Sequence, residues 1–328
     1  MKQKHEGPFR IVFFGTPGFA VPSLAKLLTL PDVLVCAVVT QPDRPAGRGN
    51  KIQVSAVKEL ARRHDIPVLQ PESIRATQQE FFTAVGSFGR VDAAVVVSFG
   101  QILPATVLEW PLAGCINVHA SLLPRWRGAA PIQRAIMAGD HVSGVCLMKL
   151  EQGLDSGPVY SSTQVVIGPD ENAGSLHDRL SQAGAELLAR DLAGIIDRQI
   201  APVPQPDSGV TLAPKIGNQE ALLDWSQPAQ VLWLKIRALS PAPGAFTFIN
   251  GKRLKIFRAV PRDTPPSPAQ QPRLPGRTVA LDPRSIGVYC GTGMLALEEV
   301  QLDGKKRMGI SDFARGAALT SGTVLGGL

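Results

Sequence analysis

The sequence predicts an α/β fold with two domains, a doubly wound parallel sheet followed by a smaller β-barrel. Three observations support this. The 328 residues are enough for two domains, at roughly 150 residues each. Short apolar runs alternate with amphipathic ones over the first 200 residues, which is typical of a Rossmann-like sheet with helices on both faces. A Pro-rich stretch follows, and then short β-type runs with one helix, a pattern that favours an OB-like barrel.

The predicted strands of the first domain are apolar runs without alternation, as expected for strands covered on both faces. These strands are Arg10–Gly15, Val33–Val39, Ile66–Leu69, Val91–Ser98, Gly114–His119 and Gly144–Leu150. Amphipathic stretches predict helices over Phe19–Leu30, Val54–His64, Ser73–Val85, Ala129–Ala138 and Leu176–Ile196. Ligands of such sheets bind beyond the carboxyl ends of the strands, so the residues just after each strand are the first candidates for a site.

The second domain is expected after a linker. We predict a catalytic domain over 1–200, a linker over 201–219 that opens with the Pro-rich residues 201–209, and a β-barrel domain over 220–328. Its predicted elements are a helix over Ala229–Leu239 and strands over Ala245–Ile249, Leu254–Ala259, Thr278–Leu281, Gly287–Tyr289 and Met294–Val300. Asn250-Gly251 predicts a tight hairpin. Residues 261–275, rich in proline, are expected to form a mobile loop.

Composition indicates a globular chain whose basic charge lies mainly in the second half. Hydrophobic residues make up 44% and charged residues 19%. The formal net charge is +7, and residues 201–328 hold 15 basic and 9 acidic side chains against 19 and 18 in the first 200. A nearly neutral domain joined to a basic one suits a catalytic domain with a module for an anionic partner. A protein that is merely basic is the alternative.

The cysteines and the apolar runs favour a cytoplasmic protein without a metal. Cys36, Cys115, Cys146 and Cys290 form no CxxC pair and lie singly in apolar stretches, as buried free thiols do. The longest apolar runs, such as Val33–Val39, fall far short of the ~20 residues that span a bilayer.

The strongest candidate for catalysis is the pair Asn117 and His119. They lie two residues apart at the end of a predicted strand, so both side chains project from one face. An amide beside an imidazole can hold an oxyanion and handle a proton. The alternative is a hydrogen-bonded polar pair that only completes the strand end.

Two Gly-containing segments add candidates. Asp155 lies between glycines after an apolar strand; alone it would be a turn-forming aspartate, and it gains interest as a partner for His119. The segment from Thr40 to Lys51 follows a strand and, with the next helix, carries six basic residues and one acidic residue over 44–63. It predicts an arm that contacts phosphates, with a solvated basic loop as the alternative.

Together, these segments resemble those of the methionyl-tRNA formyltransferases, a family of folate-dependent formyltransferases. The similar segments are Ile11-Val-Phe-Phe-Gly-Thr-Pro17, Gln41-Pro-Asp-Arg-Pro-Ala-Gly-Arg-Gly49, Ser98-Phe-Gly-Gln-Ile-Leu-Pro104, the run from Asn117 to Ile132, Gly153-Leu-Asp-Ser-Gly157 and Leu302-Asp-Gly-Lys-Lys306. The resemblance therefore covers nearly the whole length. One departure is Ser240-Pro-Ala-Pro-Gly244, where Ala242 stands at a position at which the family commonly has tryptophan.

The resemblance implies formyl transfer from 10-formyltetrahydrofolate to the α-amino group of methionyl-initiator tRNA, by a monomer that needs no metal. It makes Asn117, His119 and Asp155 the catalytic set, in which Asn117 and His119 stabilise an oxyanion and Asp155 assists proton transfer. The expected folate-binding residues are Phe99, Gly100, Gln101, Ile102, Leu103, Ser121, Leu122, Leu123 and Pro124. The expected tRNA-binding residues are Arg44, Arg48, Lys51, Lys252, Arg253, Lys255, Lys305, Lys306 and Arg307.

Other functions remain as alternatives. A formyltransferase acting on a ribonucleotide amine or an amino sugar would share the Asn–His–Asp set but would not need the 41–51 loop or a basic barrel. A nicotinamide-dependent oxidoreductase is disfavoured because Gly15-Thr-Pro-Gly18 is not GxGxxG and no acidic residue closes the next strand. A hydrolase with Ser121 as nucleophile is weaker still, since no GxSxG surrounds it.

Overall fold

The computed structural model of the chain describes residues 7–46, 51–263, 273–282, 285–316 and 319–326. These residues form two compact units. The first unit takes in residues 1–131, 142–166 and 177–213, and the second takes in residues 132–141, 167–176 and 214–328. Among the described residues, no helix combines the length and the apolar character that crossing a bilayer requires.

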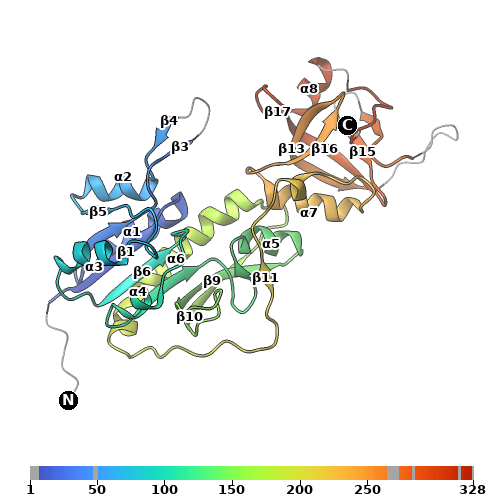
Figure 1. The fold of residues 1–328 in the computed structure, drawn as a ribbon. Coiled ribbons are helices and arrows are strands. Elements are labelled where there is room, and N and C mark those ends of the chain that lie inside the picture. The colour runs from blue at the N-terminus through green and yellow to red at the C-terminus, as the bar shows by residue number, and fades with distance from the viewer. Residues whose placement is uncertain (1–6, 47–50, 264–272, 283–284, 317–318, 327–328) are drawn as a thin grey trace. The chain divides into compact units, whose positions relative to one another are not determined.

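The first unit is built on a seven-stranded sheet in the order β10-β9-β7-β6-β1-β2-β5 (Figure 1). Its strands are β1 (Phe9–Gly15), β2 (Val33–Val39), β5 (Val68–Leu69), β6 (Ala93–Val97), β7 (Cys115–His119), β9 (Val142–Lys149) and β10 (Val159–Val166). The five strands from β7 to β5 are parallel, which confirms the predicted fold class.

Two strands at one edge depart from the parallel pattern. β9 runs antiparallel to β7, and β10 runs antiparallel to β9. Strand β10 was not predicted, because its burial alternates along an edge with one open side instead of forming a continuous apolar run.

Helices cover both faces of this sheet. Val12 and Phe14 of β1 pack with Phe81 and Val85 of α3, whereas Gly184 of α6 lies against Val118 and Val145 on the other face. The helices over the first 200 residues are η1 (Gly18–Ala20), α1 (Val21–Leu27), α2 (Ala56–Arg63), α3 (Gln78–Gly86), α4 (Ala105–Glu109), α5 (Pro131–Met137) and α6 (Ala173–Ile196). Strands β2 and β6 flank β1 on opposite sides, so the chain reverses its strand order there. The carboxyl ends of β1 and β6 therefore form the switch point at which such sheets bind ligands.

The second unit is a six-stranded antiparallel sheet in the order β12-β13-β16-β15-β14, with β17 paired to β16. The strands are β12 (Ala245–Ile249), β13 (Lys252–Arg262), β14 (Thr278–Asp282), β15 (Ser285–Tyr289), β16 (Met294–Leu302) and β17 (Met308–Gly309). Its helices η2 (Gln219–Ala221), α7 (Ala229–Leu239) and α8 (Ile310–Gly316) accompany an apolar core that includes Leu232, Ile236 and Phe313. A β domain with one main helix is as predicted.

The Asn250-Gly251 hairpin is confirmed. Ile249 pairs with Lys252, and both turn residues adopt positive φ, +49° and +70°. That backbone conformation is the one that a two-residue hairpin turn requires. Most of the loop expected over 261–275 lies outside the described residues, and its first two residues continue β13.

Residues 203–213, which we call the strap, contain a turn at 207–209 and short β pairings near each end, and these pairings bond them to the rest of the first unit. Val203 exchanges two backbone hydrogen bonds with Val159, each 2.8 Å long. At the other end, β11 (Leu212–Ala213) pairs in parallel with β8 (Arg127–Gly128). The strap is thus part of the first unit and lies across the loops that follow β7 and β9.

Candidate active site

Asn117 and His119 lie at the carboxyl end of β7. Both are nearly buried, with exposed fractions of 9% and 7%. Asn117 is in register with Val96 of β6, and His119 with Cys146 of β9. Because they are two residues apart on a strand, their side chains leave the same face of the sheet. Both residues therefore lie where the carboxyl ends of the parallel strands meet, which is where the sequence predicts a ligand site.

The hydrogen bond of His119 fixes which ring nitrogen carries a proton. Its Nε2 lies 2.8 Å from the backbone oxygen of Trp126. A carbonyl oxygen can only accept, so Nε2 is the donor. Nδ1 is then the ring nitrogen left for chemistry, and it lies 3.8 Å from Oδ2 of Asp155. That separation is too long for a hydrogen bond, but at this distance the Asp155 carboxylate attracts the imidazole once Nδ1 takes up a proton.

Asp155 is held in a tight turn after β9. Its backbone has φ of +46°, a conformation that non-glycine residues seldom adopt. Oδ2 of its carboxylate accepts a 2.8 Å hydrogen bond from the Gly128 backbone N–H. The turn folds back tightly on β9, since a Cβ on Gly157 would lie 1.9 Å from the Lys149 carbonyl oxygen. The structure therefore brings His119 and Asp155 together, as the sequence predicts, with Asn117 beside them on β7.

The five predicted folate-loop residues, Phe99 to Leu103, follow β6 at the same sheet edge but differ in what they offer. Phe99 and Leu103 are buried, and the Phe99 ring packs edge-on against Phe14 at 5.3 Å. The Gln101 side chain holds residues 71–74, donating to the carbonyl of Pro71 at 3.0 Å and accepting from the N–H of Ile74 at 2.9 Å.

The other two residues of that loop face outward. Ile102 has an exposed fraction of 85%, and Gly100 is exposed with φ of +84°. The Ile102 side chain and the loop backbone are therefore accessible to a ligand.

Four predicted folate-binding residues, Ser121 to Pro124, follow β7, and the hydroxyl of Ser121 is already engaged in hydrogen bonds within the loop. The buried Ser121 hydroxyl donates to the Trp126 carbonyl and accepts from the Trp126 N–H, each at 3.0 Å. This hydroxyl closes a turn and is not free to attack, which removes support for a serine hydrolase. Leu122 and Leu123 line a cavity of about 230 Å³ together with Val203 to Pro206 of the strap. Pro124 accepts a 3.3 Å hydrogen bond from Thr211 of the strap.

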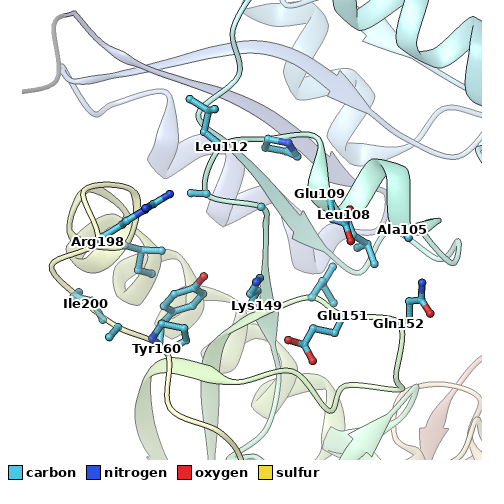
Figure 2. Close-up of a pocket in the computed structure, with 17 residues that line it drawn as sticks. Ala105, Leu108, Glu109, Leu112, Lys149, Glu151, Gln152, Tyr160, Arg198 and Ile200 are labelled. Atoms are coloured by element: carbon cyan, nitrogen blue, oxygen red, sulfur yellow. The ribbon is translucent and has the colours of Figure 1, made fainter.

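A larger cavity, of about 770 Å³, lies elsewhere in the first unit (Figure 2). It opens at the amino end of β7, where Gly114 lines it, whereas His119 ends that strand. Figure 2 shows Arg198 and Tyr160 on one side, Glu109 and Gln152 on the other, and Lys149 between them. Burial and the nearby Glu151 carboxylate raise the pKa of Tyr160. Side chains of both charge signs line this cavity.

The sequence patterns of two families match the chain. The formyl transferase family matches residues 9–192, and the formyl transferase C-terminal domain matches residues 215–318. A methionyl-tRNA formyltransferase of Magnetococcus marinus is 48% identical over 318 residues, which cover 97% of this chain and 98% of that protein. One of Alcanivorax borkumensis is 47% identical, with 94% of this chain and 92% of that protein covered.

The chain belongs to the methionyl-tRNA formyltransferase family. The predicted family and enzyme class, a formyl-group transferase, are confirmed.

Solved structures share the fold at low identity. An N-formyltransferase from Helicobacter canadensis, solved with folinic acid and dTDP-3-aminofucose, gives a TM-score of 0.64 at 16% identity, covering 92% of this chain and all of that one. A methionyl-tRNA formyltransferase from Clostridium thermocellum gives 0.51 at 14% identity, covering 77% of this chain and 93% of that one. HypX from Aquifex aeolicus, solved with tetrahydrofolic acid, gives 0.61 at 16% identity, and this chain spans about half (48%) of its length.

The predicted phosphate-contacting arm is a hairpin of β3 (Arg44–Ala46) and β4 (Lys51–Gln53) (Figure 1). Arg44 is exposed, and its guanidinium lies 3.9 Å from the carboxylate of Glu72, which is also exposed. Arg48 lies outside the described residues, and only the backbone of Lys51 is described.

The base of this arm is anchored by the buried Lys58 of α2. Its ammonium group donates to Asp43 and to Gln70, and the Gln70 amide donates to Asp43 at 3.0 Å. The hydrogen bond and charge of Lys58 hold the pKa of Asp43 below its usual range. Lys58 thus serves the fold and is not available to an external phosphate.

The six predicted basic residues of the second unit lie on β13 and in the loop after β16. The two segments meet, since the Asp303 N–H donates to the Arg253 carbonyl at 2.9 Å. Lys252, Lys305, Lys306 and Arg307 are exposed. Three of the six also have partners within the unit. The Arg253 guanidinium lies over the Phe246 ring, and the Lys255 ammonium donates to the Pro243 carbonyl. Arg307 pairs with Glu299 and lies over the Phe257 ring.

Within the described residues there is no group of three or more His, Cys, Asp or Glu side chains that could hold a metal ion. All four cysteines are free and buried, as predicted. Burial raises the pKa of Cys115 to about 12 and that of Cys146 to about 11, so both stay protonated and unreactive near neutral pH.

Three contacts of the site were not predicted. They are the Trp126 carbonyl on His119, the Gly128 N–H on Asp155, and the Gln205 side chain, which bonds to the Asp155 turn. The first two are backbone groups, which no residue type announces. Gln205 lies between prolines in a segment whose composition indicates only a linker.

Proposed function

We propose that this protein transfers the formyl group of 10-formyltetrahydrofolate to the α-amino group of methionyl-initiator tRNA. The observation that carries the proposal is near-full-length identity of 48% with a methionyl-tRNA formyltransferase. The meeting of His119 and Asp155 at the end of β7 supports it independently, because it supplies the groups that acyl transfer needs. Translation initiation, a cytoplasmic process, would be the setting.

The reaction would begin with attack of the neutral methionyl amine on the formyl carbon. A free α-amino group has a pKa of about 7.7, so a useful fraction is neutral near pH 7 to 8. The C–N bond that forms gives a tetrahedral intermediate with a negative oxygen. The Asn117 amide would donate to that oxygen, and the bond to N10 of the folate would then break to release tetrahydrofolate. A positioned donor of this kind typically contributes about 10²–10³ in rate.

His119 and Asp155 would manage the proton. Since Nε2 of His119 donates to the Trp126 carbonyl, Nδ1 is the nitrogen that would face the intermediate. A proton on Nδ1 would be attracted by the Asp155 carboxylate 3.8 Å away and would help to neutralise the oxyanion. Asp155 would also guide the proton that leaves the amine towards the departing N10. The step balances without a metal or a covalent enzyme intermediate.

The folate would lie at the carboxyl ends of β6 and β7. The exposed Ile102 and the backbone of its loop could enclose the heterocycle, and Leu122 and Leu123 provide an apolar wall at a cavity of about 230 Å³. The tRNA would contact the arm through Arg44, Arg48 and Lys51, and the second unit through its six basic residues. Of those six, the exposed lysines are the best suited to phosphate.

Incubation with methionyl-initiator tRNA and 10-formyltetrahydrofolate labelled in the formyl group tests the proposal. Label on the methionine nitrogen is expected. An amino-sugar nucleotide serves as the competing acceptor, because the Helicobacter canadensis enzyme of the same fold was solved with one. Label on the sugar amine with none on the tRNA would overturn the proposal in favour of sugar formylation.

A further inference from the structure

Gln205 of the strap bonds directly to both loops that build the candidate site. Its Nε2 donates to the carbonyl oxygen of Asp155 at 2.8 Å and to that of Gly157 at 2.7 Å. Its Oε1 accepts from Nε of Arg127 at 2.9 Å. One half-buried amide therefore joins the Asp155 turn to the segment that supplies the Gly128 N–H.

These partners leave only one orientation for the amide. The two carbonyl oxygens can only accept, so they require the NH₂ group, and the arginine can only donate, so it requires the oxygen. All three hydrogen-bonding partners are satisfied at ordinary lengths. A glutamate at this position could keep the arginine but would turn a lone-pair oxygen towards two carbonyl oxygens.

The rest of the strap holds the same two loops. Val203 pairs with Val159 just after the Asp155 turn, and Ala213 accepts from the Ala130 N–H at 3.1 Å. Gly128 has φ of +126°, and the Ala213 backbone comes so close that a Cβ there would lie 2.6 Å from its oxygen. The strap thus spans from one side of the Asp155 turn to the segment that bonds its carboxylate.

We propose that Gln205 is a positioning residue for formyl transfer, acting through Asp155. This rests on the proposed function. Asp155 adopts an unfavourable left-handed backbone conformation, so something must hold it there. Gln205 does so through the Asp155 carbonyl and keeps the carboxylate within reach of both the Gly128 N–H and His119. The strap, which the sequence presents as a linker, is by this account part of the catalytic apparatus.

Gln205→Ala and Gln205→Glu test the proposal in the full chain, with Ser208→Ala as the matched control. Ser208 is exposed in the same strap. Misplacement of a catalytic group by about 1 Å can cost up to 10²-fold in rate. We expect kcat to fall about 10- to 100-fold in both Gln205 variants, with KM for the tRNA changed less than about twofold and the control at wild-type values. A Gln205→Glu variant with wild-type kcat would overturn the proposal, because it fills the same space without the donor.

A double-mutant cycle with Asp155→Asn separates positioning from general stability. If Gln205 acts through Asp155, Gln205→Ala lowers kcat little further in the Asp155→Asn background. A full additional loss there would show that Gln205 acts elsewhere.

Backbone amide exchange over residues 150–158 gives a readout that needs no activity, and it should be faster in Gln205→Ala than in Ser208→Ala. Equal exchange would refute the contact, whereas a wild-type protein that formylates no tRNA would refute the proposed function instead.

Discussion

Gly128→Ala is the perturbation whose effect follows most directly from the geometry of the site. Gly128 combines a φ of +126° with a close approach of the strap, since a Cβ would lie 2.6 Å from the Ala213 carbonyl oxygen. The backbone strain costs about 1–3 kcal/mol. Reaching ordinary contact at 3.4 Å requires the strap and the Gly128 segment to separate by about 0.8 Å. The N–H that bonds Asp155 moves with that segment.

We therefore expect Gly128→Ala to lower both stability and kcat, the latter by about 10- to 100-fold. Gly209→Ala is the matched control, because Gly209 has φ of +79° in the strap and its Cβ would meet nothing within 4 Å. The control should lose unfolding free energy through backbone strain alone, and it should keep its kcat. Thermal unfolding and steady-state formylation kinetics of the two variants, measured in parallel, test this expectation. Equal kcat values for the two variants would refute the reasoning that the strap sets the position of Asp155.

Three further predictions follow. Asn117→Ala should lower kcat about 10²–10³-fold with tRNA affinity unchanged, and steady-state kinetics with wild-type kcat would remove Asn117 from the mechanism. Lys305→Ala with Lys306→Ala should raise KM for tRNA and reduce the salt dependence of tRNA binding by about one unit of slope per lost phosphate contact; an unchanged slope in a salt titration would contradict this. Asp43→Asn should destabilise the arm because it removes the anion beside Lys58. The folded pKa of Asp43 is lowered, so its contribution is present above its unfolded pKa of about 3.9 and lost as pH falls below it. The gap in unfolding free energy between wild type and Asp43→Asn should narrow in acid, and a gap independent of pH would contradict the ion pair.

The sequence predicted the parts of the fold that continuous apolar runs determine. The β1, β2, β6 and β7 strands are such runs, and Asn250-Gly251 has turn chemistry strong enough to place a hairpin. The edge strand β10 was missed, because a half-exposed strand carries a weak alternating pattern. The antiparallel direction of β9 was also missed, since direction depends on the connection and not on composition.

The site was predictable to the extent that side chains carry its chemistry. The Asn117–His119 spacing and the glycines around Asp155 marked these residues, and the structure brings His119 and Asp155 together. The roles of the Trp126 carbonyl and the Gly128 N–H could not be predicted, because backbone groups are the same at every residue and carry no sequence signal. Gln205 was hidden because its partners are backbone carbonyls and an arginine that are distant in sequence.

A crystal structure of the protein with a folate analogue that keeps a formyl group on N10 but cannot transfer it tests the central claim most directly. The account places the folate over the carboxyl ends of β6 and β7, with its formyl group on the side of Asn117 and His119. An oxygen in the formyl position should then lie about 2.7–3.1 Å from the Asn117 amide nitrogen. Folate bound instead in the cavity lined by Lys149 and Tyr160, at the other end of β7, would contradict the account.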